Sequence, residues 1–207
     1  MPSLRFHKRV VPWLVLLLVA APVAVAQAHH VSDGGPTNGL SIPSLTHGQM
    51  AVIANYQSAI LDLANREPFP DRPFRRLLNF VEIEQFNCLW GLVPASISDE
   101  DSPFNECSHA RLAGTQALLL HMEKLPGDQR AVQDLVQQID TAMVMRDAAL
   151  ELCRYSDEPF NTADTITPHW LSVPRHWPSL LFFLALGMVT VGAISATRRV
   201  LGHRKTA

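Results

Sequence analysis

Residues 45–63 read LTHGQMAVIANYQSAILDL, and this stretch sets the fold class of the chain. Thr46 and Gln49 have the spacing of a capping box, in which the threonine hydroxyl accepts from the Gln49 amide and the glutamine side chain returns to the Thr46 amide. Leu45 and Met50 occupy the positions of a hydrophobic staple around this cap. Apolar side chains then recur with helical spacing at Ile53, Tyr56, Ile60 and Leu63. We therefore expect a helix that begins at Thr46 and ends before the prolines at 68 and 70.

Three further segments show the same helical period, and each begins at a capping residue. These caps are Asp71, Ser102 and Asp128, and the last of the three helices is expected to end near Tyr155. Four helices with short connections favour an up-down bundle. The sequence therefore predicts an all-α protein with a four-helix bundle at residues 44–155.

The charged residues divide the chain into an acidic centre and two basic ends. All 19 aspartates and glutamates lie between Asp33 and Asp164, whereas that interval holds only nine of the 17 lysines and arginines. A charged fraction of 17% beside 47% hydrophobic residues argues against a disordered or nucleic-acid-binding chain. We expect an acidic globular domain between two basic-flanked apolar segments, with no nucleic-acid partner.

The first apolar segment, residues 10–26, has the layout of a secretory signal peptide. Basic residues precede it, and the small-residue sequence Ala-Gln-Ala closes it at 26–28. Cleavage after Ala28 would make residues 1–28 the signal peptide and residues 29–43 a flexible mature N-terminus. An uncleaved signal anchor is the alternative.

The second apolar segment predicts a single transmembrane helix at residues 177–197. It approaches the ~20 residues that a bilayer requires, and it begins at Trp177, a residue type favoured at the headgroup level. Arg198 and Arg199 follow it, and basic residues concentrate on the cytoplasmic side of membrane helices. Residues 198–207 are therefore expected to form a basic cytoplasmic tail.

These two apolar segments together predict an exported domain on a C-terminal anchor. The signal peptide exports the acidic domain, and we favour the periplasm of a bacterium, with the anchor in the inner membrane. Residues 156–176 lie between the bundle and the anchor and contain three prolines. This composition favours an extended linker.

The up-down topology brings several reactive side chains to one end of the bundle. They are His47, Met50, Cys88, Cys107, His109 and Cys153. An exported chain with three cysteines is expected to form one disulfide and leave one thiol free. Cys88 with Cys107 would close a loop of about 20 residues, worth roughly 3 kcal/mol in the chain-entropy description, and would leave Cys153 free. Cys107 with Cys153 is the rival pair.

The mature N-terminus suggests a copper site. Cleavage after Ala28 leaves His29 and His30 at the start of the chain, and an α-amine with its own imidazole can chelate Cu(II) through two nitrogens. This arrangement resembles the histidine brace of lytic polysaccharide monooxygenases and the N-terminal copper site of periplasmic copper carriers. The resemblance is confined to His29, with His30 or His47 as partners. Those families have β-sandwich scaffolds, so their fold and activity do not carry over to a helical chain.

The candidate metal ligands are therefore His29, His30, His47 and Met50, because imidazole and thioether groups suit copper. A simpler interpretation needs no metal. In that interpretation the paired histidines are tolerated in a flexible terminus, Met50 is only the staple, and His47 is an exposed residue of the first helical turn.

Catalytic motifs are absent from the sequence. It holds no glycine-rich phosphate loop and no HExxH, GxSxG or CxxC motif, and its spacing reveals no serine, histidine and acid arrangement. We therefore expect a non-enzymatic, membrane-anchored periplasmic accessory or interaction protein. Its partners would be other envelope or membrane proteins, in addition to the membrane itself. The alternative is a periplasmic copper-binding or copper-delivery protein.

Overall fold

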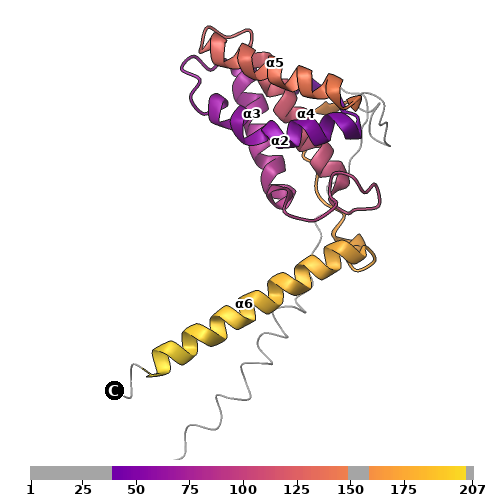
Figure 1. Ribbon diagram of the computed structural model, residues 1–207, viewed down its shortest axis with the longest axis vertical. Coiled ribbons are helices and arrows are strands. Elements are labelled where there is room, and N and C mark those ends of the chain that lie inside the picture. The colour runs from indigo at the N-terminus through magenta and orange to yellow at the C-terminus, as the bar shows by residue number, and fades with distance from the viewer. Residues whose placement is uncertain (1–38, 149–158, 204–207) are drawn as a thin grey trace, which may run out of the picture. The chain divides into compact units, whose positions relative to one another are not determined.

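The computed structural model describes residues 39–148 and 159–203 (Figure 1). Within these ranges the chain is mostly helical, which agrees with the predicted all-α class. The predicted signal peptide, His29, His30 and Cys153 lie outside the described residues, as do positions 204–207 of the basic tail.

Three helices begin at the predicted caps, Thr46, Asp71 and Asp128. At Thr46 both halves of the capping box are present. At the two aspartates a side-chain oxygen accepts from the backbone amide three residues later. These caps begin α2 (His47–Ala64), α3 (Arg72–Asn87) and α5 (Gln129–Met145).

The remaining helix of the domain, α4 (Asn105–Met122), does not begin at Ser102 as predicted. Its N-cap is Phe104, whose side chain makes no capping hydrogen bond. The backbone amide of Asn105 instead donates to the carbonyl of Ser102 at 3.0 Å, which closes a turn in front of the helix. The Asn105 side chain then donates to the carbonyls of Ser96 and Ile97, so it holds the preceding loop rather than the helix start.

Helix α4 lies at the centre of the core. It contacts α2, α3 and α5, and most of its residues are buried. Small residues allow this close packing, as at Gly114, where an added Cβ would lie 2.9 Å from the ring of Phe80. A helix that is buried on nearly all sides needs no single apolar stripe. The helices α2, α3 and α5 therefore all pack against α4.

A disulfide joins the end of α3 to the start of α4. Cys88 is the C-cap of α3 and Cys107 lies in the first turn of α4, with their Cα atoms 5.7 Å apart. Both cysteines are buried. This is the pair favoured from the sequence, and it brings the two ends of the long α3–α4 connection together.

The described part of the predicted linker, residues 159–176, packs against the helices instead of extending freely. Its strand β2 (Phe160–Asn161) pairs antiparallel with β1 (Ser41–Ile42), which falls within the predicted flexible N-terminus. Ile166 is buried, and a short 3₁₀ helix, η3 (Trp170–Ser172), follows it. We call residues 159–176 the strap. Its apolar side chains reach the core, which the proline content alone does not reveal.

The last helix, α6 (Trp177–His203), has the composition of a membrane span. Its segment Trp177–Thr197 is 21 residues long, and its most apolar 18 residues have a mean hydropathy of 2.1 and include no buried residue. This length and this composition suffice to cross a bilayer. The structure thus supports the predicted anchor at the level of length and composition.

Candidate functional site

Two histidines from different helices lie side by side in the domain. The ring centroids of His47, in the first turn of α2, and His109, in α4, are 5.2 Å apart. His109 is fully buried, and burial together with the charge of His47 lowers its pKa to about 4. The Nε2 atom of His47 is also buried and has no hydrogen-bond partner in the described part of the chain. Neutral imidazole is a common metal ligand, so the neutral ring of His109 and the unpartnered Nε2 of His47 are chemically suited to bind a metal.

The predicted copper ligands are only partly placed by the structure. His29 and His30 lie outside the described residues. Met50 is fully buried in the hydrophobic core, in agreement with its role as a staple. Over residues 39–148 and 159–203, no group of three His, Cys, Asp or Glu side chains is arranged to hold a metal ion. The structure adds His109, which was predicted at the same end of the helices as His47 but not as a metal ligand.

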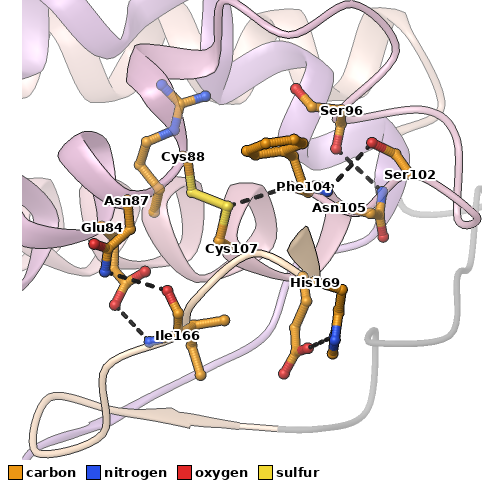
Figure 2. Close-up of a disulfide and its surroundings, with 12 residues drawn as sticks. Glu84, Asn87, Cys88, Ser96, Ser102, Phe104, Asn105, Cys107, Ile166 and His169 are labelled. Atoms are coloured by element: carbon orange, nitrogen blue, oxygen red, sulfur yellow. Dashed lines mark hydrogen bonds and ion pairs between the residues drawn. A yellow bond between two sulfur atoms is a disulfide. The ribbon is translucent and has the colours of Figure 1, made fainter. Parts of the chain in front are cut away.

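A buried carboxylate attaches the strap to α3 (Figure 2). The backbone amide of Ile166 donates to Glu84 Oε1 at 2.8 Å, and the Asn87 side chain donates to the Ile166 carbonyl at 3.3 Å. Glu84 is completely buried, and desolvation raises its pKa to about 7 despite the Ile166 hydrogen bond, which acts in the opposite direction. Its second oxygen, Oε2, has no partner among the described residues.

A second attachment of the strap lies beside the disulfide (Figure 2). His169 Nε2 lies 3.1 Å from Glu106 Oε2, and the His169 backbone amide donates to the Pro103 carbonyl at 2.9 Å. The His169 side chain is mostly exposed, so the backbone bond is the better shielded of the two. Together with Glu84, these contacts fasten the strap along α3 and the start of α4.

A buried arginine occupies the interface between α2 and α4. Arg111 Nη1 donates to Gln57 Oε1 at 2.8 Å, and Gln57 in turn donates to Thr115. No carboxylate in the described part of the chain pairs with Arg111, and burial lowers its pKa to about 10. A Cβ added at Gly91 would lie 2.6 Å from the guanidinium, so the turn after α3 packs directly against this cation.

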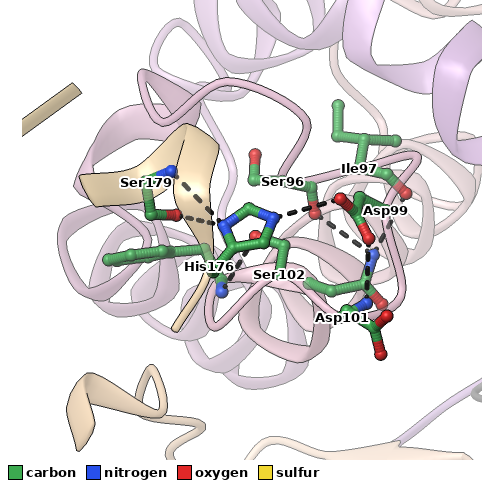
Figure 3. A network of polar contacts seen from close by, with 9 residues as sticks. Ser96, Ile97, Asp99, Asp101, Ser102, His176 and Ser179 are labelled. Carbon is green, nitrogen blue, oxygen red and sulfur yellow. Dashed lines mark hydrogen bonds and ion pairs between the residues drawn. The ribbon is translucent and has the colours of Figure 1, made fainter. Parts of the chain in front are cut away.

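The start of α6 is hydrogen-bonded to the α3–α4 connection through a histidine (Figure 3). His176 precedes the first residue of α6, and its Nδ1 lies 2.7 Å from the Ser179 hydroxyl and accepts from the Ser179 amide. Because Nδ1 accepts, the ring proton of a neutral His176 is on Nε2, which donates to Asp99 Oδ2 at 3.0 Å. This hydrogen bond lowers the pKa of Asp99.

Ser179, His176 and Asp99 are thus a serine, histidine and acid arrangement that the sequence spacing did not reveal. The acid lies 77 residues before the histidine, so only the folded chain brings them together. Ser179 is fully buried in the first turn of α6, and the ring nitrogen accepts from its backbone amide as an N-cap side chain does. The observed chemistry is that of a helix cap. The only feature of the sequence that indicates this cap is His176 itself, a hydrogen-bonding residue immediately before the apolar helix.

In comparisons with protein-family models, curated proteins and solved structures, the chain has no significant match.

Proposed function

We propose that the protein is an exported accessory protein of a bacterial inner membrane. The helical domain would lie in the periplasm, α6 would cross the membrane once, and the basic tail would lie in the cytoplasm. The length and composition of α6 support the anchor, and the signal-peptide pattern at residues 1–28 supports the export. The helices α2 to α5 would form an up-down bundle.

The observation that carries this proposal is how firmly the domain is attached to α6. His176 bonds to Asp99 at the start of the helix. The ring of Phe104 packs against Trp170 and against Phe183, which lies within the apolar segment of α6, at centroid distances of 5.3 and 6.1 Å. These polar and aromatic contacts keep the domain next to α6, whereas a long flexible linker would allow it to move away from the membrane. We infer that its partners are envelope or membrane proteins at the membrane surface.

Processing and orientation can be tested on the full-length chain expressed in bacteria. We expect the protein to remain in the membrane after alkaline carbonate extraction and its N-terminus to read His-His-Val. A fluorescent reporter that folds only in the cytoplasm should be active at the C-terminus, and a periplasmic phosphatase should be inactive there. An unprocessed Met1 with an active C-terminal phosphatase would contradict both the export and the orientation.

A second candidate function, copper binding or delivery, is favoured by the histidine pair. His47 and His109 are adjacent, and His47 Nε2 is buried without a partner in the described residues. The mature N-terminus could supply the further ligands from His29 and His30. The site would then combine an α-amine with imidazoles, a donor set that suits Cu(II).

Copper titration of the mature protein tests this second function. A residue added before His29 should abolish tight Cu(II) binding, because it removes the free α-amine from the chelate. His47→Ala should weaken binding less, since it removes one ligand of several. His169→Ala, at an exposed histidine of the strap, is the matched control and should have no effect. Equal, weak binding by the mature and extended forms would exclude the copper site.

A further inference from the structure

Three large apolar side chains are exposed where α3 ends. Phe86, Trp90 and Leu92 are 65%, 52% and 65% exposed, and the rings of Phe86 and Trp90 meet edge to face at 5.5 Å. We call these three residues the Trp90 patch. Single exposed apolar residues need no explanation, but a clustered tryptophan and phenylalanine are typical of a contact surface.

The backbone beneath the Trp90 patch adopts a rare conformation. Leu89, Trp90 and Gly91 have φ values of 50°, 55° and 69°, in the left-handed region, and they form the 3₁₀ turn η1 (Leu89–Gly91). Two successive residues other than glycine in this region are unfavourable, because the Cβ of each comes close to the following carbonyl oxygen. The turn is fixed on one side by the Cys88–Cys107 disulfide and on the other by the packing of Gly91 against Arg111. The exposed patch therefore stands on a rigid base.

The same end of the domain adjoins the apolar helix α6. The disulfide joins Cys88, next to the patch, to the first turn of α4. Phe104, immediately before α4, contacts Phe183 in the second turn of α6. Asp99 of the α3–α4 connection bonds to His176 (Figure 3). Phe183 lies six residues beyond Trp177, or roughly 9 Å along the helix at 1.5 Å per residue. This end of the domain is thus level with the first turns of the membrane helix.

We propose that the disulfide-bonded end of the domain rests in the headgroup layer of the bilayer, with the Trp90 patch as its lipid contact. This inference rests on the proposed membrane anchoring by α6. Tryptophan favours the membrane interface because its ring is apolar and its N–H can still reach water or headgroups. Asp99, Glu100 and Asp101 lie in the neighbouring loop and outnumber Arg175, the cation that lies beside Asp99 and Asp101, so the charge at this end disfavours an anionic surface. The lipid partner is therefore a zwitterionic surface.

Depth-dependent quenching of single tryptophans tests the proposal in the full chain. The chain has tryptophans at positions 13, 90, 170 and 177. Two variants keep one tryptophan each, Trp90 or Trp177, with phenylalanine at the other three positions. Each is reconstituted in phosphatidylcholine vesicles whose acyl chains are brominated near the headgroup. We expect Trp90 emission to be lost to an extent comparable with that of Trp177.

A matched control places a tryptophan at the opposite end of α3. Phe69 is 62% exposed and precedes α3, about 24 Å from its other end by helix rise. In a chain without other tryptophans, Phe69→Trp should be quenched by iodide in the aqueous phase and not by the brominated lipid. Circular dichroism and the intact disulfide establish that each variant is folded.

Two different failures can be distinguished by these variants. Absence of lipid quenching at Trp177 would overturn the membrane anchoring itself. Quenching at Trp177 with none at Trp90 would overturn only the seating of the domain in the lipid. If a single-tryptophan variant does not fold, Trp90→Phe in the otherwise native chain replaces it. The lipid-quenchable fraction of the total emission must then fall, and an unchanged fraction would overturn the proposal.

Discussion

Glu84 is a buried residue whose ionisation should lower the stability of the folded domain. Its pKa rises from 4.5 to about 7 in the folded protein because burial penalises the charged carboxylate. A group with a raised folded pKa contributes stability that is fully present below its unfolded pKa and is lost as the pH rises through the folded pKa. The cost of ionising Glu84 therefore grows between about pH 4.5 and 7, and it reaches roughly 3 kcal/mol above that window.

We predict that Glu84→Gln removes this pH dependence and stabilises the protein at neutral pH. The glutamine oxygen can still accept from the Ile166 amide, and no charge is buried. Urea unfolding from pH 4.5 to 8 provides the measurement, read as the difference in unfolding free energy between native and variant. Glu82→Gln, at an exposed glutamate of the same helix, is the control. Parallel pH profiles for Glu84→Gln and Glu82→Gln would contradict the burial argument.

The connection between α3 and α4 is the element that the disulfide constrains. Cys88 and Cys107 are separated by 19 positions, and closing a loop of this size stabilises a protein by about 3 kcal/mol. We predict that Cys88→Ser and Cys107→Ser each lower the unfolding free energy by about this amount. The measurement is thermal or denaturant unfolding under non-reducing conditions.

Cys153 lies outside the described residues, and it distinguishes the favoured disulfide from its rival. If Cys153 is the free thiol, Cys153→Ser leaves the stability unchanged, and peptide mapping recovers Cys88 linked to Cys107. The rival pairing predicts the reverse, with Cys153→Ser as damaging as Cys107→Ser and Cys88→Ser harmless. Peptide mapping and the stability of the three serine variants must identify the same disulfide, so each measurement checks the other.

Helix starts were predictable from the sequence where a cap is local. Thr46, Asp71 and Asp128 accept hydrogen bonds from amides within three residues, and such bonds depend on sequence spacing alone. Ser102 has the right residue type, but the folded loop uses it for a turn before α4. The side chain of Asn105 holds this loop in place, because it donates to backbone carbonyls eight and nine residues earlier. The spacing of capping residues extends over only three or four positions, so it cannot predict such a contact.

The strap was not predictable because its attachments are distant in sequence. Ile166 bonds to a carboxylate 82 positions away, and His169 bonds to one 63 positions away. Proline-rich composition describes the backbone of such a segment but not its partners. The same reason explains the candidate site. An up-down order of the helices predicts His47 and His109 at the same end, but their contact, with ring centroids 5.2 Å apart, appears only in the folded chain.

At the scale of the whole molecule, the strap and the α6 cap act as one connection. The strap joins β1 to the helices through β2, and it ends at His176, which caps α6 and bonds to Asp99. Loosening any of these contacts would lengthen the free chain between the domain and its anchor. The strap and the start of α6 should therefore open locally much less often than a flexible linker would.

Trypsin sensitivity at Arg175 reports this local opening. Arg175 is exposed and precedes His176, but cleavage there requires the strap to leave its packed conformation. His176→Ala removes the side-chain cap of α6 and the hydrogen bond to Asp99, which together cost on the order of 1–2 kcal/mol. We therefore predict that His176→Ala raises the rate of cleavage at Arg175 by about tenfold in detergent-solubilised protein. Mass spectrometry of the fragments over time provides the measurement.

Two controls separate local opening from global unfolding. His169→Ala removes an exposed histidine from the same strap and should change the rate at Arg175 little, because exposed ion pairs contribute little. Cleavage at Arg111, which is buried in the core, requires the whole domain to unfold and should stay slow in both variants. If His176→Ala accelerates cleavage at Arg111 as much as at Arg175, the histidine stabilises the domain as a whole. If neither site responds, the cap does not hold the domain to its anchor.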